Sequence, residues 1–150
     1  MRVFLLYFCY TMRMLRKKIL NRLCVAIVSL FILNELATFF SWYSLAWWFD
    51  MPMHFLGGIS VFYMAAFIWA PALKWVPVWR YVYESVITAM LLGVLWEALE
   101  LYLHLRYGSP DFILLDSFSD VFFDLSGVLA AAFMLVPIIE VYKPASKKSR

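Results

Sequence analysis

Four long apolar stretches dominate the pattern of hydrophobic and polar residues in this chain of 150 residues. They run from Leu23 to Tyr43, from Met53 to Trp69, from Ser85 to His104 and from Asp120 to Tyr142. About 20 helical residues cross the ~30 Å hydrocarbon core of a bilayer. Each stretch approaches or exceeds that length, although the second is short. We therefore predict four membrane-spanning helices.

The composition of the chain supports this prediction. It is 65% hydrophobic and 15% charged, whereas soluble domains have about 45–50% apolar and about 25% charged residues. In lipid only helices and closed barrels satisfy their backbone polar groups, and unbroken apolar runs favour helices over the alternating strands of a barrel. The predicted fold class is all-α, a polytopic transmembrane bundle of about four spans.

The positions of Lys and Arg predict the orientation of the bundle. Twelve of these thirteen residues precede the first span, separate the second from the third or follow the fourth, and only Arg106 lies elsewhere. Lys and Arg accumulate in short cytoplasmic loops. We therefore predict that both termini are cytoplasmic, and that the segments around Asp50 and from Arg106 to Ser119 face outward. The expected location is the inner (plasma) membrane, as a multi-pass protein.

Three parts follow from this arrangement. Residues 1–22 form a basic cytoplasmic lead, residues 23–142 a single four-helix membrane domain, and residues 143–150 a basic cytoplasmic tail. Basic clusters beside apolar runs suit anionic lipid head groups, so membrane lipids are the expected partners and nucleic acid is not. Cys9 and Cys24 both lie on the predicted cytoplasmic side, so we expect no disulfide.

The beginning of the chain has two interpretations. The apolar run from Val3 to Tyr10 is short for a secretory signal and leads into basic residues instead of a cleavage motif. Residues 1–13 are then an extension at the membrane interface. Alternatively, translation starts at Met12 or Met14, which leaves an ordinary basic lead before the first span.

Acidic residues concentrate on the predicted outer side. Seven of the ten lie in outer segments or the outer halves of spans: Asp50, Glu97, Glu100, Asp111, Asp116, Asp120 and Asp124. Ionisable groups at membrane depth are costly, usually face the bundle interior and mark functional sites. Their clustering is stronger evidence than any one of them.

Helical spacing groups these acids further. Asp116, Asp120 and Asp124 recur every four residues and so share one stripe of the fourth span, while Glu97 and Glu100 share a face of the third. Glu97 and Asp124 lie at similar depths below the outer ends of their helices. We therefore expect the two acidic faces to meet across a helix interface.

His54 stands near the outer start of the second span, followed by Gly57 and Gly58, which would let a neighbouring helix approach closely. Carboxylates with one imidazole suit a divalent cation such as Mg²⁺, Mn²⁺, Ca²⁺ or Zn²⁺, and without one they would have to share protons. The candidate metal ligands are His54, Glu97, Glu100, Asp120 and Asp124. His54 and Glu97 are also the candidate catalytic residues.

Some of these residues also have plainer interpretations. Asp50, just before Pro52, is more simply a helix cap than a ligand, and Asp116 also suits a cap. Asp111 suits a solvated loop. His54 is as readily a hydrogen-bonded structural residue as a ligand. Asp50, Asp111 and Asp116 are therefore left out of the predicted site.

Three polar residues elsewhere remain open. Asn34 and Glu35 lie in the middle of the first span, where they either hydrogen-bond across the bundle or, for Glu35, reach the floor of an outer cavity. Arg106 either pairs with a loop carboxylate or binds an anionic group.

Three motifs in this order resemble a known family. They are His54-Phe-Leu-Gly-Gly58, Trp96-Glu97-x-x-Glu100 and Asp116-x-x-x-Asp120-x-x-x-Asp124-x-x-Gly127. Together they resemble the YjdF-like family of uncharacterised bacterial inner-membrane proteins and, more distantly, the VanZ-like group, named for a teicoplanin-resistance protein. The resemblance covers roughly Asp50 to Ala132. It implies a membrane location and a shared polar cluster, but no settled reaction.

The chain departs from both patterns. YjdF-like proteins are longer and have additional spans, and Asp124 stands where an Asn is usual in the VanZ-like pattern.

Three functions remain open at this point. The first is a metal-dependent enzyme or lipid-modifying factor that acts on phospholipid or polyprenyl-phosphate head groups at the outer leaflet, with His54 as ligand or general base. The second is proton or cation transport, for which four spans would need a homo-oligomer. The third is a non-catalytic binding or assembly protein in the envelope. Phosphate-binding glycine loops, His-Glu-x-x-His and Gly-x-Ser-x-Gly motifs do not occur in the sequence.

Overall fold

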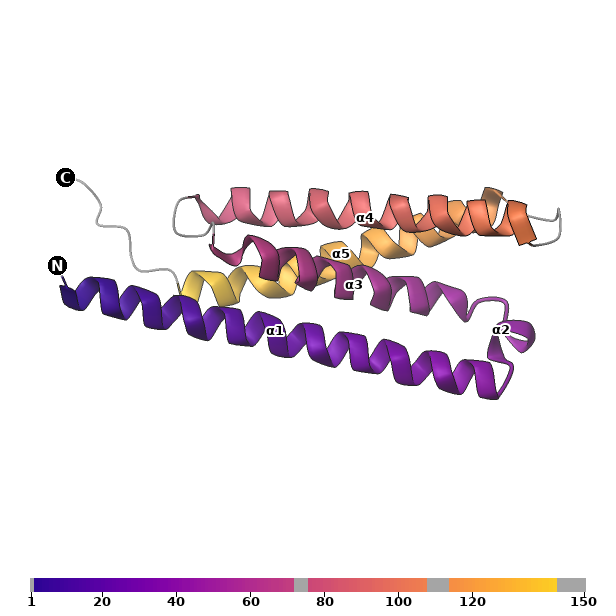
Figure 1. Cartoon of the computed structure of the whole chain (residues 1–150), viewed down its shortest axis with the longest axis horizontal. Helices are drawn as coiled ribbons and strands as arrows, with labels where there is room; N and C mark the ends of the chain where they lie inside the picture. Colours follow the sequence, from indigo (N-terminus) through magenta and orange to yellow (C-terminus); the bar gives the residue numbers. More distant parts are fainter. Residues whose placement is uncertain (1, 72–75, 108–113, 143–150) are drawn as a thin grey trace.

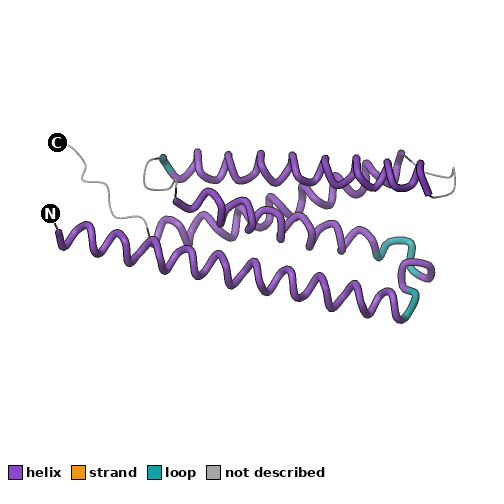
Figure 2. Tube along the Cα trace, viewed as in Figure 1, coloured by secondary structure: helices purple, strands orange, loops and turns teal. Residues whose placement is uncertain are grey.

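The computed structural model describes residues 2–71, 76–107 and 114–142. These residues form helices joined by short turns, without a strand among them (Figures 1 and 2). The helices are α1 (Arg2–Phe39), α2 (Trp42–Leu45), α3 (Asp50–Trp69), α4 (Val78–Tyr107) and α5 (Leu114–Tyr142). The predicted all-α fold is confirmed.

Four of these helices are long and apolar enough to cross a bilayer. The spans are Tyr10–Phe39, Asp50–Trp69, Val78–Tyr107 and Phe118–Ile139. The chain is thus a multi-pass membrane protein, as predicted. Helix α1 begins and α5 ends at the same end of the bundle (Figure 1), as an even number of antiparallel spans requires. Which side of the membrane that end faces stays a prediction from the charges.

The first span ends earlier than predicted. Ser41 has φ 56°, in the left-handed region, so the chain turns there instead of continuing to Tyr43. A left-handed residue stops an α-helix because its carbonyl no longer points along the helix axis. Tyr43 consequently lies on the short helix α2. At the other end, residues 2–13, predicted as an extension at the membrane interface, form the first turns of α1 itself.

The other boundary corrections concern α4 and α5. Helix α4 begins at Val78, directly after Pro77, so Arg80 lies on the helix and not in a loop, with its Nε 3.7 Å from Glu84 Oε1. Helix α5 begins before Asp116, so this residue lies inside the helix and does not precede it as a cap. The side chain of Asp116 and the whole of Asp111 and Lys74 lie outside the described residues.

Helix α3 is the centre of the bundle. It packs most extensively against α5 and also against α1 and α4, whereas α1 and α4 make no extensive contact with each other within the described residues. Figure 1 shows α3 and α5 between the outer pair. The core of fully buried side chains lies toward the end where α1 begins, and includes Leu15, Ile19, Phe62, Tyr81, Leu135 and Ile139.

Two glycines allow α3 and α5 to lie unusually close. A Cβ atom at Gly58 would collide with the backbone carbonyl of Asp124, and one at Gly127 would collide with the carbonyl of Phe55. Only glycine brings two helix backbones together in this way. The predicted close approach at Gly58 is confirmed, and it holds Asp124 against α3.

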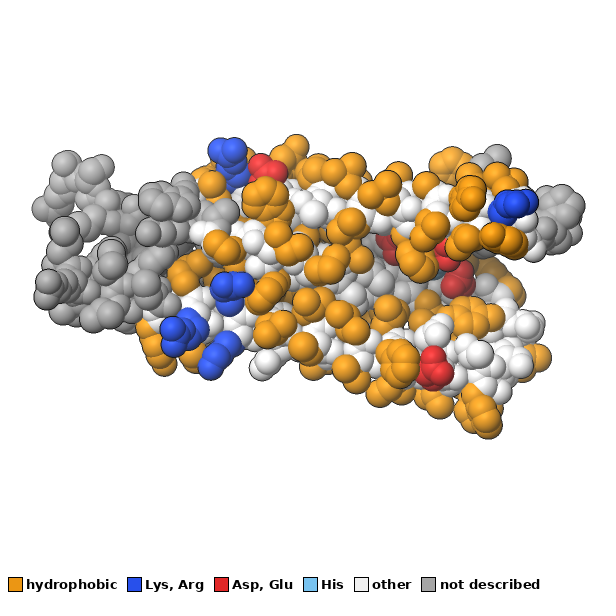
Figure 3. Space-filling view, in the orientation of Figure 1, with side chains coloured by type: hydrophobic (Ala, Val, Ile, Leu, Met, Phe, Trp, Pro, Cys, Tyr) orange, Lys and Arg blue, Asp and Glu red, His pale blue; other side chains and the backbone are white. Residues whose placement is uncertain are grey.

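Charged side chains are unevenly distributed along the bundle. In Figure 3 most of the visible Lys and Arg side chains lie near the end where α1 begins, while acidic side chains are visible inside a hollow between α4 and α1 toward the other end. This polarity agrees with the charge pattern from which the orientation was predicted.

Candidate functional site

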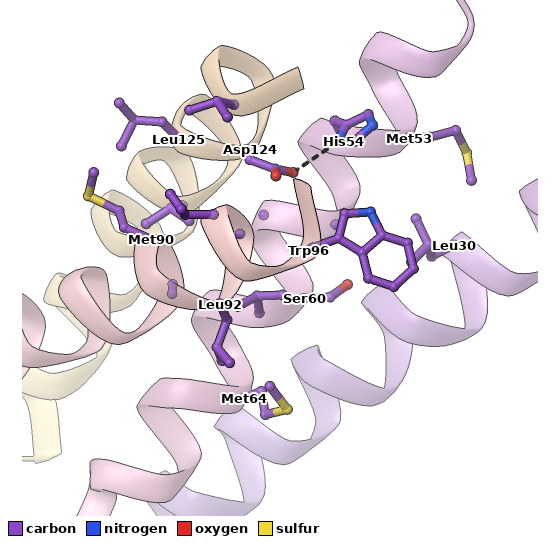
Figure 4. A pocket seen from close by; sticks show the side chains of 18 of the residues that line it. Leu30, Met53, His54, Ser60, Met64, Met90, Leu92, Trp96, Asp124 and Leu125 are labelled. Carbon is purple, nitrogen blue, oxygen red and sulfur yellow. Dashed lines mark ion pairs between the residues drawn. The ribbon is translucent and has the colours of Figure 1, made fainter. Parts of the chain in front are cut away.

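His54, on the second turn of α3, lies among four carboxylates. Its Nε2 is 3.6 Å from Asp50 Oδ2 and 3.7 Å from Asp120 Oδ1. Its Nδ1 is 3.4 Å from Asp124 Oδ1 and 3.7 Å from Glu97 Oε1. Figure 4 shows the contact with Asp124 as a dashed line. Each ring nitrogen therefore faces two acids.

Helical spacing explains how these side chains meet. Asp50 and His54 are four residues apart on α3, and Asp120 and Asp124 are four residues apart on α5, so each pair shares one face of its helix. Glu97 comes from α4. The predicted meeting of the two acidic faces is confirmed, because Glu97 and Asp124 both lie beside Nδ1 of His54.

Most of this cluster is withdrawn from the surface. The side chains of His54, Glu97 and Asp120 are 9%, 10% and 8% exposed, whereas that of Asp50 is 42% exposed. Burying several like charges costs much free energy unless a cation or shared protons offset it. A cation or shared protons would offset this cost, and Asp50 marks the more accessible side of the cluster.

The distances around His54 are compatible with ligands that share one metal ion. Hydrogen bonds to nitrogen measure about 2.7–3.2 Å, shorter than any of the four contacts. Two ligand atoms about 2.1 Å from one tetrahedral ion lie about 3.4 Å apart. Two sets of three residues could each offer ligand atoms that all lie within 4.8 Å of one another. One set is Asp50, His54 and Asp120, and the other is His54, Glu97 and Glu100.

A cavity of about 820 Å³ adjoins the cluster. Its polar lining residues are gathered near the end of α3 where the chain enters it from α2, and the remaining lining is largely apolar. His54 and Asp124 lie on this lining beside Trp96, Met53 and Leu30 (Figure 4). The cavity thus has one charged end and one apolar end.

The carboxylate of Asp124 lies between two glycines on neighbouring helices, Gly57 on α3 and Gly93 on α4. A Cβ at Gly57 would be 3.6 Å from Oδ1, and a Cβ at Gly93 would be 3.4 Å from Oδ2. These glycines, on α3 and α4, leave room for the carboxylate to enter the interface. Gly93 was not predicted as part of the site, and only its place four residues before Glu97 hinted at a shared face.

Asp50 is the main correction to the predicted site. The residue that precedes α3 is Phe49, and no side chain caps the helix there. Asp50 instead points along α3 toward His54. Its spacing of four residues from His54 was the signal that favoured this pairing over a cap.

Of the remaining residues considered in the sequence, two line the cavity and two are exposed outside its described lining. Glu100 is half-buried and lines the cavity, as does Asn34, which accepts a hydrogen bond of 3.0 Å from the hydroxyl of Tyr43. Glu35 is exposed on α1 and is not part of the described cavity lining, so it does not form the floor. Arg106 is exposed, with its guanidinium 5.7 Å from the ring of Tyr107.

Tyr43 was not predicted as a site residue. It lies outside the spans, on α2, and lines the cavity. Burial raises the pKa of its hydroxyl, and the charge of Asp50 raises that pKa further. The neutral phenol is thus a hydrogen-bond donor at the mouth of the site.

Comparison with known proteins adds no identification. No family model, no curated protein and no solved structure matches this chain. The resemblance of the three motifs to YjdF-like and VanZ-like proteins therefore stays a prediction.

Proposed function

We propose that this protein binds a divalent cation at the cluster around His54 and uses it to act on the phosphate head group of a phospholipid or polyprenyl phosphate at the outer leaflet. One observation carries the proposal: a buried imidazole with two carboxylates beside each ring nitrogen, at the charged end of an otherwise apolar cavity.

The charge balance explains why a cation is central. The cluster holds five carboxyl groups: Asp50, Glu97, Glu100, Asp120 and Asp124. They would repel a phosphate unless a cation lay between them. A divalent ion held by some of them would offset their charge, bind a phosphate oxygen and polarise the phosphoryl group. His54 then serves as a ligand or as a general base.

Transport fits the cavity less well. Beyond the charged end, Ser60 is the single hydroxyl among the described lining residues, and its Oγ donates to the Leu56 carbonyl of its own helix. A proton or ion leaving the cluster would have to pass mainly apolar side chains such as Val61, Met64 and Ala89. A translocation pathway normally lines its course with polar groups.

Metal content tests the proposal. The protein is purified in mild detergent, incubated with Mg²⁺, Ca²⁺, Mn²⁺ or Zn²⁺, freed of unbound ions and measured by elemental analysis. We expect a stoichiometric ion in the wild type and its loss in Asp120→Asn, which removes a buried ligand charge. Glu84→Gln is the control, since Glu84 pairs with Arg80 at the other end of α4 and should leave the metal content unchanged.

Two outcomes would contradict the proposal. A wild-type protein that holds none of these ions would favour proton binding by the carboxylates. An Asp120→Asn protein that keeps its ion but melts at a lower temperature would favour a structural role for the cluster. If the ion binds, phospholipids and polyprenyl phosphates are offered in turn, and changes in their head groups are followed by mass spectrometry.

A further inference from the structure

The cavity continues well beyond the charged cluster. Beyond His54 its lining on α3 continues to Met64, ten residues along the helix, which is about 15 Å at 1.5 Å per residue. Along this length the walls come from α1 and α4, with Leu30 on one side and Leu92 on the other (Figure 4). We call this apolar part the α1/α4 groove.

The groove lies within the membrane-spanning segments. Its lining residues belong to all four spans, Tyr10–Phe39, Asp50–Trp69, Val78–Tyr107 and Phe118–Ile139. Helices α1 and α4 make no extensive contact with each other over the described residues, and the hollow between them is visible in Figure 3. Phe31 and Val94, on opposite walls, are both exposed. At this depth the surrounding medium is lipid, so the groove opens sideways to acyl chains.

We propose that the α1/α4 groove holds one alkyl chain of a membrane lipid that enters sideways between α1 and α4, with the lipid's phosphate head group at the His54 cluster. The charged end and the apolar end match the two ends of such a molecule. The substrate is therefore a lipid that resides in the membrane, and not a soluble phosphate. Only the position of the head group rests on the proposed function; the chain site stands on the groove itself.

The size of the cavity suits a small molecule such as a lipid. Its volume is about 820 Å³. The cavity is within the range of about 300–1,000 Å³ that small-molecule sites occupy. A flexible chain can follow the groove without separating its walls.

Lipid that copurifies with the protein tests the inference. Met64→Trp and Leu92→Trp place bulk in the groove, away from the cluster. Ile68→Trp and Leu91→Trp are matched controls on the same helices, because both side chains are exposed and neither lines the cavity. After extensive detergent washing, bound lipid is quantified by mass spectrometry, and metal content is measured on the same samples.

We expect lipid to fall several-fold in Met64→Trp and Leu92→Trp, with unchanged metal content and no loss in the two controls. An equal fall in all four variants, or a washed wild type without lipid, would overturn the inference. A wild type that keeps lipid but binds no metal would overturn the proposed function and leave the groove assignment standing.

A second measurement uses the wild type alone, in case the Trp variants do not fold. A phospholipid with a photoreactive group at the end of its chain is added to the purified protein in mild detergent. We expect labelling of residues around Met64 that excess phospholipid suppresses and that glycerol phosphate does not. Labelling there that excess phospholipid leaves unchanged would show ordinary surface lipid and reject the site.

Discussion

At the residue scale, the number of hydrogen bonds that His54 can make limits its role. A neutral imidazole has one donor and one acceptor, and a protonated one has two donors. The ring can therefore donate to at most two of the four carboxylates that lie 3.4–3.7 Å from it. His54 alone therefore does not donate a hydrogen bond to every carboxylate of the cluster.

Far from the cluster, the side chain of Tyr81 on α4 is hydrogen-bonded to the backbone of α3. The buried hydroxyl of Tyr81 donates a hydrogen bond of 2.6 Å to the carbonyl of Ala66. Tyr81→Phe should lower the free energy of unfolding in detergent by about 1 kcal/mol, the usual net value of such a bond. Tyr83→Phe, at an exposed position on the same helix, should change it by less than about 0.5 kcal/mol. Equal effects would show that the bond contributes nothing.

At the element scale, the α3–α5 interface places the acids of α5 beside His54. At Gly58 and Gly127 the two helix backbones contact each other directly, in addition to the buried side chains that α3 and α5 share in the core. Small residues serve this purpose in membranes, where apolar side chains gain little from leaving lipid. The site and the closest helix contact therefore share the same turns of α3 and α5.

Neighbouring glycines on α3 allow a sharp test of this contact. Gly58→Ala places a methyl group on the Asp124 carbonyl and should lower the free energy of unfolding by about 1–3 kcal/mol or more, as overpacking does. At Gly57 the added Cβ would meet Asp124 Oδ1 at an ordinary 3.6 Å, and alanine favours helix. Gly57→Ala should therefore be neutral or stabilising. Thermal unfolding of both variants in the same detergent measures the difference, and similar melting temperatures would contradict the packing argument.

At the scale of the whole molecule, most basic residues lie near one end of the bundle and the acidic cluster around His54 lies near the other. The exposed Arg13, Arg16 and Lys17 lie near the beginning of α1, whereas the cluster around His54 lies near the α2 end. The Lys and Arg distribution predicts that the end with the basic residues faces the cytoplasm. The cluster and the charged end of the cavity would then face outward.

Reporter fusions test this orientation. A fluorescent protein that matures only in the cytoplasm should be active when fused after Arg150, and a phosphatase active only outside should be inactive there. The reverse result is expected for fusions after Trp47, in the segment between α2 and α3. Outward activity at the C-terminus would reverse the orientation and place the cluster on the cytoplasmic side.

The spans illustrate how far sequence reasoning extends. The existence of four spans was predictable because hydropathy and length are local properties of the chain. Their ends were not: the left-handed Ser41 stops α1 before Tyr43, and α4 begins as early as Val78. Polar residues near the interface, such as Arg80, remain helical because helix formation continues beyond the hydrocarbon core.

The candidate site was partly predictable for a related reason. Asp120 and Asp124 share a stripe by helical periodicity alone, and an acid at membrane depth has few places to lie except the interior. Asp50 was misjudged as a cap because position before a proline says nothing of a partner one turn later. Tyr43 and Gly93 carried no chemical signal that pointed to the cluster.

The sequence by itself determined an all-α membrane protein with acidic residues and a histidine concentrated in one half of the bundle, because length, hydropathy and periodicity act within each helix. Only the tertiary structure decided which acids face each nitrogen of His54, where Asp124 enters between Gly57 and Gly93, and that α1 and α4 leave a groove between them. Those features depend on the rotation and depth of each helix relative to its neighbours. That geometry is set by contacts between residues distant in the chain, such as Gly58 with Asp124, which no local pattern encodes.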